Sequence, residues 1–300
     1  VYSRTKEKGL AFAAPYGVKT VFTDLEEMAA TDKIDAVYIA SPNKLHIEQA
    51  RVFLEHGKHV ICEKPLSAHA KDVAELQALA KECGLIYLEA IMFMHLPQRK
   101  LLEEALKKIG DISVAKIDFC QRSSKYDAYL AGSLPNIFNP ALETGALMDL
   151  GVYCVYPALY LFGNPQNTLA VSHLLASGAD GSDIVAMQYP DKLVNLVFSK
   201  VGQAGANTDF QGTNGTVSVE SISKLANISI RYNNGTVEEV CGEEEKFKLM
   251  GYEAKDFYRY ITEPEASRAE YERCSALAHD VSVYMEEIRK LANIRFPSDN

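Results

Sequence analysis

The sequence predicts an α/β protein: a doubly wound parallel sheet over residues 1–110, followed over residues 111–300 by an α+β domain with an open, mainly antiparallel sheet. Up to Gly110, short apolar runs alternate with segments of helical spacing, which is typical of parallel strands joined by helical crossovers. Beyond Gly110, apolar and polar residues alternate and Asn-Gly pairs mark tight turns, which is typical of antiparallel hairpins.

Strand-like apolar runs organise the first unit. They lie at residues 1–2, 19–22, 35–40, 58–62 and 85–90. Apolar residues at helical spacing predict helices over residues 47–57 and 73–84, and each of these segments stops at a glycine. Strands that alternate with such helices indicate a Rossmann domain, in which ligands bind at the carboxyl edge of the sheet.

The beginning of the chain lacks one feature of that fold. In a dinucleotide-binding sheet the first strand leads into a G-x-G-x-x-G turn, and residues 1–110 contain no such pattern. We therefore expect that roughly 25–30 residues, the usual size of a strand–turn–helix unit, precede Val1 in the native protein.

The second unit begins with a strand at residues 112–120 and an irregular segment at 122–144. A strongly apolar helix is expected over 145–162, and a long closing helix, able to pack back on the first unit, over 268–292 after Pro264. Further strands are expected at 170–175, 183–189 and 192–199, with hairpin turns at 213–216 and 233–236.

Composition and charge narrow the class of protein. The 300-residue chain is 47% hydrophobic and 24% charged, as expected for a globular enzyme. Its net charge of -9 disfavours nucleic acid or an anionic membrane as partner, and no apolar run approaches the roughly 20 residues that cross a bilayer. The six cysteines form no C-x-x-C pair, which favours reduced thiols in a cytoplasmic protein and gives no support for a metal site.

Ser3 and Arg4 follow the opening strand, where a dinucleotide fold contacts the adenosine ribose. An acidic residue at this position binds the 2′-hydroxyl of NAD, whereas a hydroxyl and a guanidinium suit the 2′-phosphate of NADP. The pair therefore favours NADP over NAD as cofactor, with an exposed Ser-Arg turn as the alternative.

Ser41, Pro42, Asn43 and His46 follow the strand at 35–40, at the edge where a cofactor binds. All four are candidate cofactor contacts. Pro42 and Asn43 are also ordinary residues for the entry to a helix. A lone histidine in a first helical turn, such as His46, is more often structural than catalytic.

Glu63, Lys64 and Pro65 close the next strand at the same edge. A lysine is seldom placed at the end of a buried strand without a partner or ligand, so Lys64 is a candidate for binding a substrate oxygen. The alternative is a solvated loop lysine.

Asp149 and Tyr153 lie four residues apart and share one face of the apolar helix at 145–162. A carboxylate in such a helix needs a partner, because burying it alone costs several kcal/mol, and Lys64 is the expected partner. The alternative is a purely structural hydrogen bond between Asp149 and Tyr153.

Four segments in this order resemble the glucose–fructose oxidoreductase / inositol dehydrogenase (Gfo/Idh/MocA) family. They are S-P-N-K-L-H (41–46), G-K-H-V-I-C-E-K-P-L-S (57–67), E-A-I-M-F-M-H-L-P-Q (89–98) and G-A-L-M-D-L-G-V-Y-C (145–154). The resemblance implies a Rossmann domain and a second domain whose open sheet serves in homodimer or homotetramer contacts. It also implies NADP or NAD as cofactor and hydride exchange with a sugar, polyol or related cyclic alcohol.

By position, Lys64 matches the family lysine that touches nicotinamide and substrate, and Asp149 and Tyr153 match the D-x-G-x-[YH] pair. The tyrosine is similar to that of dihydrodiol dehydrogenases and aldose 1-dehydrogenases. We expect Tyr153 to exchange the substrate proton, Lys64 to lower the pKa of its phenol, and Asp149 to orient Lys64 or the substrate. Met94 departs from the family, since many members have an arginine there.

Two other classes of function remain open. One is an NADP-binding sensor of the same fold without catalysis, and the other is an interaction scaffold that uses the open sheet. The irregular segment at 122–144 is expected to shape the substrate pocket, with a solvated connector as the alternative. Its candidate residues are Arg122, Lys125, Tyr126, Tyr129, Asn136 and Asn139.

Overall fold

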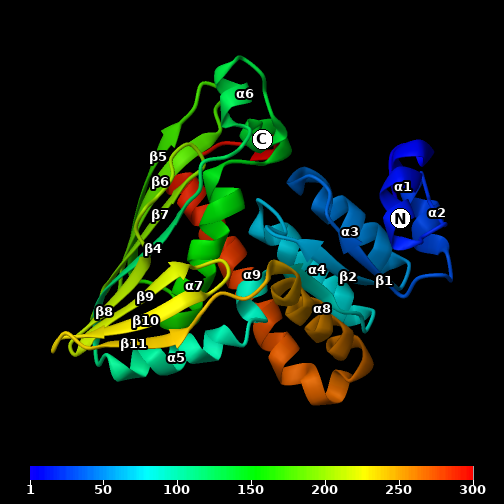
Figure 1. The fold of residues 1–300 in the computed structure, drawn as a ribbon. Helices are drawn as coiled ribbons and strands as arrows, with labels where there is room; N and C mark the ends of the chain where they lie inside the picture. The colour runs from blue at the N-terminus through cyan, green and yellow to red at the C-terminus, as the bar shows by residue number, and fades with distance from the viewer. Residues whose placement is uncertain (300) are drawn as a thin grey trace.

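Two β-sheets organise residues 1–299, the part of the chain that the computed structural model describes, and long helices lie between them (Figure 1). The smaller sheet is parallel, in the order β1-β2-β3. Its strands are β1 (Ala36–Ile39), β2 (His59–Glu63) and β3 (Tyr87–Ala90), joined through α3 (His46–Glu55) and α4 (Ala70–Glu82). The predicted parallel sheet and its crossover helices are confirmed.

The runs expected as strands at residues 1–2 and 19–22 are reduced to a single parallel bridge between Tyr2 and Phe22. A strand needs a neighbour along several residues, and a cavity of about 730 Å³ lies between this bridge and β1. A short helix follows each run: α1 (Lys6–Ala13) and α2 (Leu25–Ala30).

The larger sheet has the strand order β11-β10-β9-β8-β4-β7-β6-β5. β4 and β7 pair in parallel, and the other neighbouring pairs are antiparallel, so the prediction of a mainly antiparallel sheet is confirmed. Both predicted hairpin turns form, between β8 and β9 and between β10 and β11. The strands are β4 (Ile112–Cys120), β5 (Asn167–Leu174), β6 (Asp180–Gln188), β7 (Leu193–Ser199), β8 (Thr208–Gly212), β9 (Gly215–Ser221), β10 (Ala226–Tyr232) and β11 (Val237–Cys241).

Three helices lie against one face of the larger sheet: α5 (Gln98–Lys108), α7 (Val152–Phe162) and α9 (Pro264–Leu291) (Figure 1). The closing helix α9 also contacts α4 and β3, so it packs on both units. It begins at Pro264 rather than at 268, because proline is well suited to the first position of a helix. Before it lies α8 (Lys246–Thr262), which the sequence patterns did not predict.

The apolar helix expected over 145–162 opens with a π-helical turn, η6 (Leu147–Gly151), before α7 continues as a regular helix. A Cβ atom on Gly151 would approach the ring of Phe198 to 2.9 Å, so the turn lies close against β7. π-helical turns are frequent at functional sites, and this one contains Asp149.

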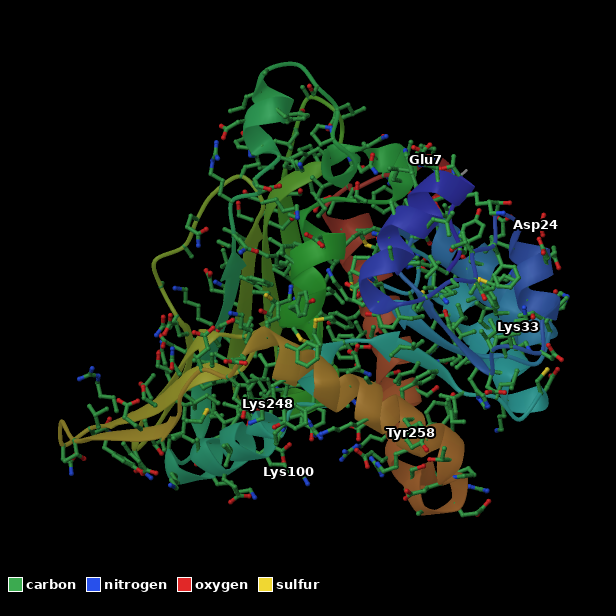
Figure 2. All side chains as sticks on the ribbon, turned by 45° about the vertical axis from the view of Figure 1, so that its right-hand side comes forward. Glu7, Asp24, Lys33, Lys100, Lys248 and Tyr258 are labelled. Carbon is green, nitrogen blue, oxygen red and sulfur yellow. The ribbon has the colours of Figure 1, made fainter. Side chains whose placement is uncertain are left out.

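Charged side chains cover the outside of both units. Glu7, Asp24, Lys33, Lys100 and Lys248, which are labelled in Figure 2, are all exposed. No helix within residues 1–299 combines the length and apolar character needed to cross a bilayer. In the same residues no three metal-ligating side chains gather at one place.

Candidate active site

Lys64 and Asp149 meet between the two units, as predicted. Lys64 stands near the end of β2, and its Nζ atom donates to Asp149 Oδ1 at 2.9 Å and to the Asp149 main-chain oxygen at 2.8 Å. The Lys64 side chain is only 12% exposed. The lysine is therefore a buried, paired cation and not a solvated loop residue.

Lys200, which directly follows β7, is a second cation at this site. Its ammonium forms an ion pair with the other carboxylate oxygen of Asp149, Oδ2, and its side chain is 6% exposed. The sequence analysis missed Lys200, although a lysine at the end of an apolar strand is the signal that singled out Lys64. A strand pattern alone does not reveal that the ends of β2 and β7 converge on one carboxylate.

Tyr153 lies on the first turn of α7, beside the ion pairs. Lys64 Nζ is 4.9 Å from the centre of the Tyr153 ring, and Phe119 packs edge-on against that ring at 5.4 Å between centroids. Within residues 1–299 no hydrogen bond joins Tyr153 to Asp149, so the purely structural alternative for this pair is not what the fold adopts. The phenol and the amine, which come from different units, lie in one place.

Opposing charges set the proton affinities of the three ionic groups. Burial raises the pKa of Asp149, but Lys64 and Lys200 together outweigh burial and hold that pKa at about 2. Burial lowers the pKa of Lys64, but the charge and hydrogen bond of Asp149, together with the charges of Tyr153 and Glu63, outweigh burial, so the net shift is upward. For Lys200, burial prevails over the attraction of Asp149, and its pKa is lowered.

The pKa of Tyr153 corrects one expectation. Lys64 was expected to bring the phenol pKa toward neutral pH, and its charge does act in that direction. Burial is the larger effect, however, and the charges of Glu63, Asp149 and Glu253 act with it, so the pKa of Tyr153 lies above its usual value. Tyr153 is therefore a protonated phenol at neutral pH in the protein alone.

Three of the residues predicted to bind the cofactor line the cavity of about 730 Å³: Ser3, Arg4 and Ser41. Arg4 is exposed and forms no ion pair within the described chain, and the Ser41 hydroxyl is buried without a hydrogen-bond partner there. An unpartnered guanidinium and an unsatisfied hydroxyl fit a ligand that carries phosphate and ribose oxygens. The residues present thus fit a dinucleotide, and their contacts with it remain a prediction.

Three other predicted cofactor residues lie after β1 or at the end of β2. Asn43 donates through Nδ2 to the main-chain oxygen of Glu143 at 2.9 Å, so it ties the first unit to the irregular segment of the second. Pro42, just before it, is exposed. Glu63 accepts a hydrogen bond from the Tyr38 hydroxyl at 2.6 Å.

His46 is buried, and its ring lies between two main-chain oxygens. Nδ1 is 2.9 Å from the oxygen of Pro65, and Nε2 is 2.9 Å from the oxygen of Ser41. With both ring nitrogens engaged by the backbone, the geometry favours a structural role for His46 over the predicted cofactor contact. The ring links the loop after β1 to the loop that carries Lys64.

Two buried carboxyl groups near this loop were not singled out from the sequence. Glu89 accepts from the Leu66 amide at 3.1 Å and from the Tyr156 hydroxyl, and burial raises its pKa to about 7. Burial and the charges of Glu63 and Glu89 raise the pKa of Glu253 to about 8. Glu89 therefore connects the loop after Lys64 to α7.

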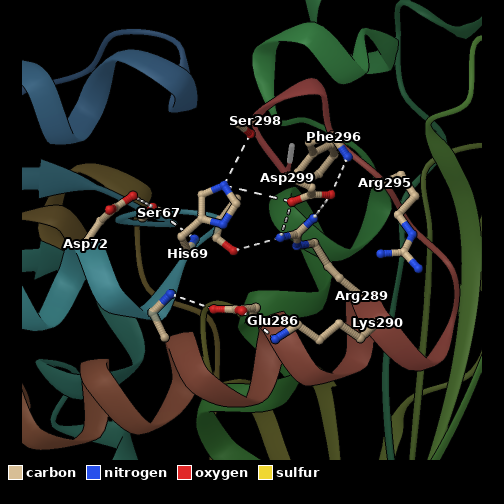
Figure 3. Close-up of polar contacts among 12 residues, drawn as sticks. Ser67, His69, Asp72, Glu286, Arg289, Lys290, Arg295, Phe296, Ser298 and Asp299 are labelled. Atoms are coloured by element: carbon tan, nitrogen blue, oxygen red, sulfur yellow. Dashed lines mark hydrogen bonds and ion pairs between the residues drawn. The ribbon is translucent and has the colours of Figure 1, made fainter.

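The segment that follows Lys64 is also anchored by the end of the chain (Figure 3). Arg289 donates to the Ala68 main-chain oxygen at 3.0 Å and to both carboxylate oxygens of Asp299 at 3.1 and 3.0 Å. His69 lies 3.2 Å from the Ser298 hydroxyl, and the Ala70 amide donates to Glu286 at 2.9 Å. These contacts hold residues 68–70 against α9.

Most candidates in the segment 122–144 support the segment itself. Arg122 pairs with Asp127 at 2.6 Å, and Tyr126 and Tyr129 stack on each other and pack on Phe138. The main-chain oxygen of Asn136 and that of Asn139 accept from the Thr144 hydroxyl, the Asn139 side chain caps the next short turn, and Lys125 is exposed. Met94, the departure from the family pattern, is 2% exposed and packs in the core.

Known proteins resemble the chain over nearly its whole length. Residues 1–90 match the family model "Oxidoreductase family, NAD-binding Rossmann fold", and residues 99–218 match "GFO/IDH/MocA C-terminal domain". The scyllo-inositol 2-dehydrogenase (NADP(+)) IolU of Bacillus subtilis (strain 168) is 41% identical over 301 residues, which cover 100% of this chain and 90% of that relative. The trans-1,2-dihydrobenzene-1,2-diol dehydrogenase of Mus musculus is 27% identical over 315 residues, covering 100% of this chain and 90% of the relative.

Solved structures share the fold. A levoglucosan dehydrogenase in complex with NADH and levoglucosan superposes with a TM-score of 0.83 at 18% identity, covering 97% of this chain and 87% of the other. At that level of identity the likeness concerns the arrangement of the two units and their sheets.

Proposed function

Because the chain belongs to the Gfo/Idh/MocA family of oxidoreductases, we propose that it transfers a hydride between NADP and a carbon that bears a hydroxyl or carbonyl group in a polyol, sugar or related cyclic alcohol. The observation that carries this proposal is the convergence of Lys64 and Tyr153 on one site, with Lys64 Nζ 4.9 Å from the phenol ring. The inositol dehydrogenase relative at 41% identity supports a cyclic polyol as the substrate class.

In this proposal the protein supplies proton transfer and orientation. The nicotinamide, when bound, accepts or donates the hydride at C4. In oxidation the Tyr153 phenolate takes the hydroxyl proton as the C–H bond is lost to hydride transfer, and in reduction the phenol returns that proton to the alkoxide oxygen. The Lys64 ammonium stabilises negative charge on the substrate oxygen and the phenolate, and Asp149 holds Lys64 in place.

The cofactor preference rests on Arg4. Arg4 comes shortly after Tyr2, the residue that forms the bridge to Phe22, and it is exposed. It lines the same cavity as Ser3 and Ser41. A guanidinium suits a 2′-phosphate, which NADP has and NAD lacks. We therefore assign NADP as the preferred cofactor.

The function is tested by mixing the protein with NADP or NAD and a panel of inositols and aldoses, and following the absorbance of the reduced nicotinamide. Turnover with NADP and at least one cyclic polyol is expected. Arg4→Ala should raise the KM for NADP about tenfold or more, because one charge-assisted phosphate contact is lost, and should leave the KM for NAD within about twofold.

Tight NADP binding without turnover of any panel member would instead identify a sensor. An equal change in both KM values would show that Arg4 does not contact the 2′-phosphate.

The open face of the larger sheet supports self-association. Leu169, Val171, Ile184 and Leu193 share this face and are 67%, 65%, 50% and 57% exposed. Contiguous exposed apolar residues on a sheet mark an interaction surface. We propose a homodimer or homotetramer formed through this face.

Replacing Val171 by glutamate should shift the sedimentation equilibrium of the protein to monomer, because a charge is placed in the buried interface. The matched control is Val18→Glu, an equally charged change at a 41% exposed valine outside both sheets, which should leave the assembly intact. A wild-type protein that is monomeric at micromolar concentration would contradict the proposal.

We further propose a cytoplasmic location. The six cysteines are free thiols, and three of them are buried. Reduced thiols of this kind are typical of a reducing compartment.

A further inference from the structure

The Asp149 carboxylate is shared between two ammonium groups from different units. Oδ1 accepts from Lys64, near the end of β2, and Oδ2 pairs with Lys200, at the end of β7. Lys200 is fixed by its backbone as well, since its amide donates to the Gly181 oxygen and its own oxygen accepts from the Ser123 amide, both at 2.8 Å. The carboxylate is therefore held from both sides.

Lys200, the second lysine, changes the net charge of the site. An isolated pair of Lys64 and Asp149 has no net charge, whereas the trio with Lys200 carries one net positive charge. A neutral pair stabilises a nearby phenolate or alkoxide weakly, because the field of its carboxylate cancels much of the field of its ammonium. With Asp149 neutralised by Lys200, the charge of Lys64 acts on its surroundings without that cancellation.

The hydrogen bonds of Lys64 also indicate a role for Lys200. An ammonium has three N–H donors, and Lys64 uses two of them on Asp149, at Oδ1 and at the main-chain oxygen. If Oδ2 were free, the carboxylate would be able to turn and bring both oxygens toward Lys64. Lys200 occupies Oδ2, so the third N–H of Lys64 remains available to a substrate oxygen.

We propose that Lys200 is a positioning residue for the hydride transfer: it fixes and neutralises Asp149, so that Lys64 presents an uncompensated positive charge and a free N–H to Tyr153 and the substrate oxygen. The assignment rests on the proposed function, because it concerns the same site. Lys200 acts through Asp149 and Lys64.

The test uses the full chain without cofactor or substrate and follows the ionisation of Tyr153 directly. The protein is labelled with 3-fluorotyrosine, whose phenol is more acidic than that of tyrosine, and the ¹⁹F shift of residue 153 is identified by its absence in Tyr153→Phe. The groups that act on this phenol are Glu63 at the end of β2, Lys64 directly after it, Asp149 from η6 and Glu253 from α8. Asp180 acts on Lys200 from β6.

Lys200→Met is expected to reduce the ionised fraction of residue 153 at a given pH about threefold or more, since a nearby positive charge is lost. Lys200→Gln keeps a hydrogen-bond donor but no charge, and should shift the titration in the same direction. Lys200→Arg keeps the positive charge and should restore most of the ionised fraction of residue 153. With substrate, kcat for oxidation should fall about tenfold in Lys200→Met and Lys200→Gln, with the KM for NADP unchanged.

Lys192→Met is the matched control. Lys192 lies just before β7, at the other end of a strand that spans roughly 20 Å, and pairs with Asp191. This variant should leave both the titration and kcat unchanged.

A lower kcat in Lys200→Met and Lys200→Gln with an unchanged titration of residue 153 would overturn the proposal and leave Lys200 a structural residue. Unchanged values of both quantities would also overturn it. If Lys200→Met fails to fold, the titration of residue 153 and kcat in Lys200→Gln and Lys200→Arg provide the test. A shifted titration in a protein that turns over no member of the panel would support the electrostatic role while rejecting the proposed function.

Discussion

Replacing Lys64 by methionine is expected to lower kcat by about 10³-fold or more, because both charge stabilisation of the substrate oxygen and assistance to Tyr153 are lost. The fold should survive. Asp149 keeps Lys200 as its ion-pair partner, so no unpaired carboxylate is left buried. Steady-state kinetics on the substrate found in the panel, with circular dichroism and a thermal melt for each protein, measure the two effects separately.

Lys71→Met serves as the matched control for that experiment. It removes the same charge from the surface of α4, where the Lys71 side chain is 85% exposed and pairs with Glu75 at 3.7 Å. Its kcat and melting temperature should match those of the wild type. A Lys64→Met protein with near wild-type kcat would show that Lys64 is not part of the reaction.

Removing the hydroxyl of Tyr153 is the second change with a large expected effect. Tyr153→Phe keeps the ring that packs on Phe119 and lies under Lys64, but removes the group proposed to exchange the proton. Loss of a general acid–base group lowers kcat by about 10²–10⁴-fold. The melting temperature should change little, because within residues 1–299 no hydrogen bond to the Tyr153 hydroxyl stabilises the fold.

The ionisation of Tyr153 also determines how kcat depends on pH. The pKa of Tyr153 is raised, so the phenolate needed for oxidation is a minor species near neutral pH. Below that pKa, kcat for oxidation should rise about tenfold per pH unit, as the phenolate fraction does. Reduction uses the phenol and should be nearly independent of pH over the same range.

Tyr153→Phe should remove the rising limb of the oxidation profile. If the rise persists in Tyr153→Phe, a different group takes the substrate proton, and the assignment of Tyr153 is wrong.

The order of strands and helices was largely determined by the sequence itself. Local periodicity indicated β1 to β3, α3 and α4, and the Asn-Gly pairs indicated the hairpins at 213–216 and 233–236, because these signals arise from side-chain spacing and turn conformation. Local periodicity was less successful where the formation of a strand depends on a neighbouring strand. Residues 1–2 and 19–22 have the composition of strands, yet they form only the bridge between Tyr2 and Phe22.

Some residues of the candidate active site could likewise be predicted from the sequence, and others could not. Lys64 and Asp149 were recognisable as a pair because a charged residue in an apolar element requires a partner, and the structure joins them. Lys200 was not, since its relation to Asp149 depends on how the end of β7 meets the π-helical turn.

The proton affinity of Tyr153 was decided by the tertiary structure alone. Its neighbour Lys64 was foreseen, but the direction of the shift was set by burial and by the carboxylates of Glu63 and Glu253, which reach the phenol from two other elements. Spacing along the chain determines which side chains share an element, whereas long-range packing determines the dielectric surroundings and the sum of charges at one atom.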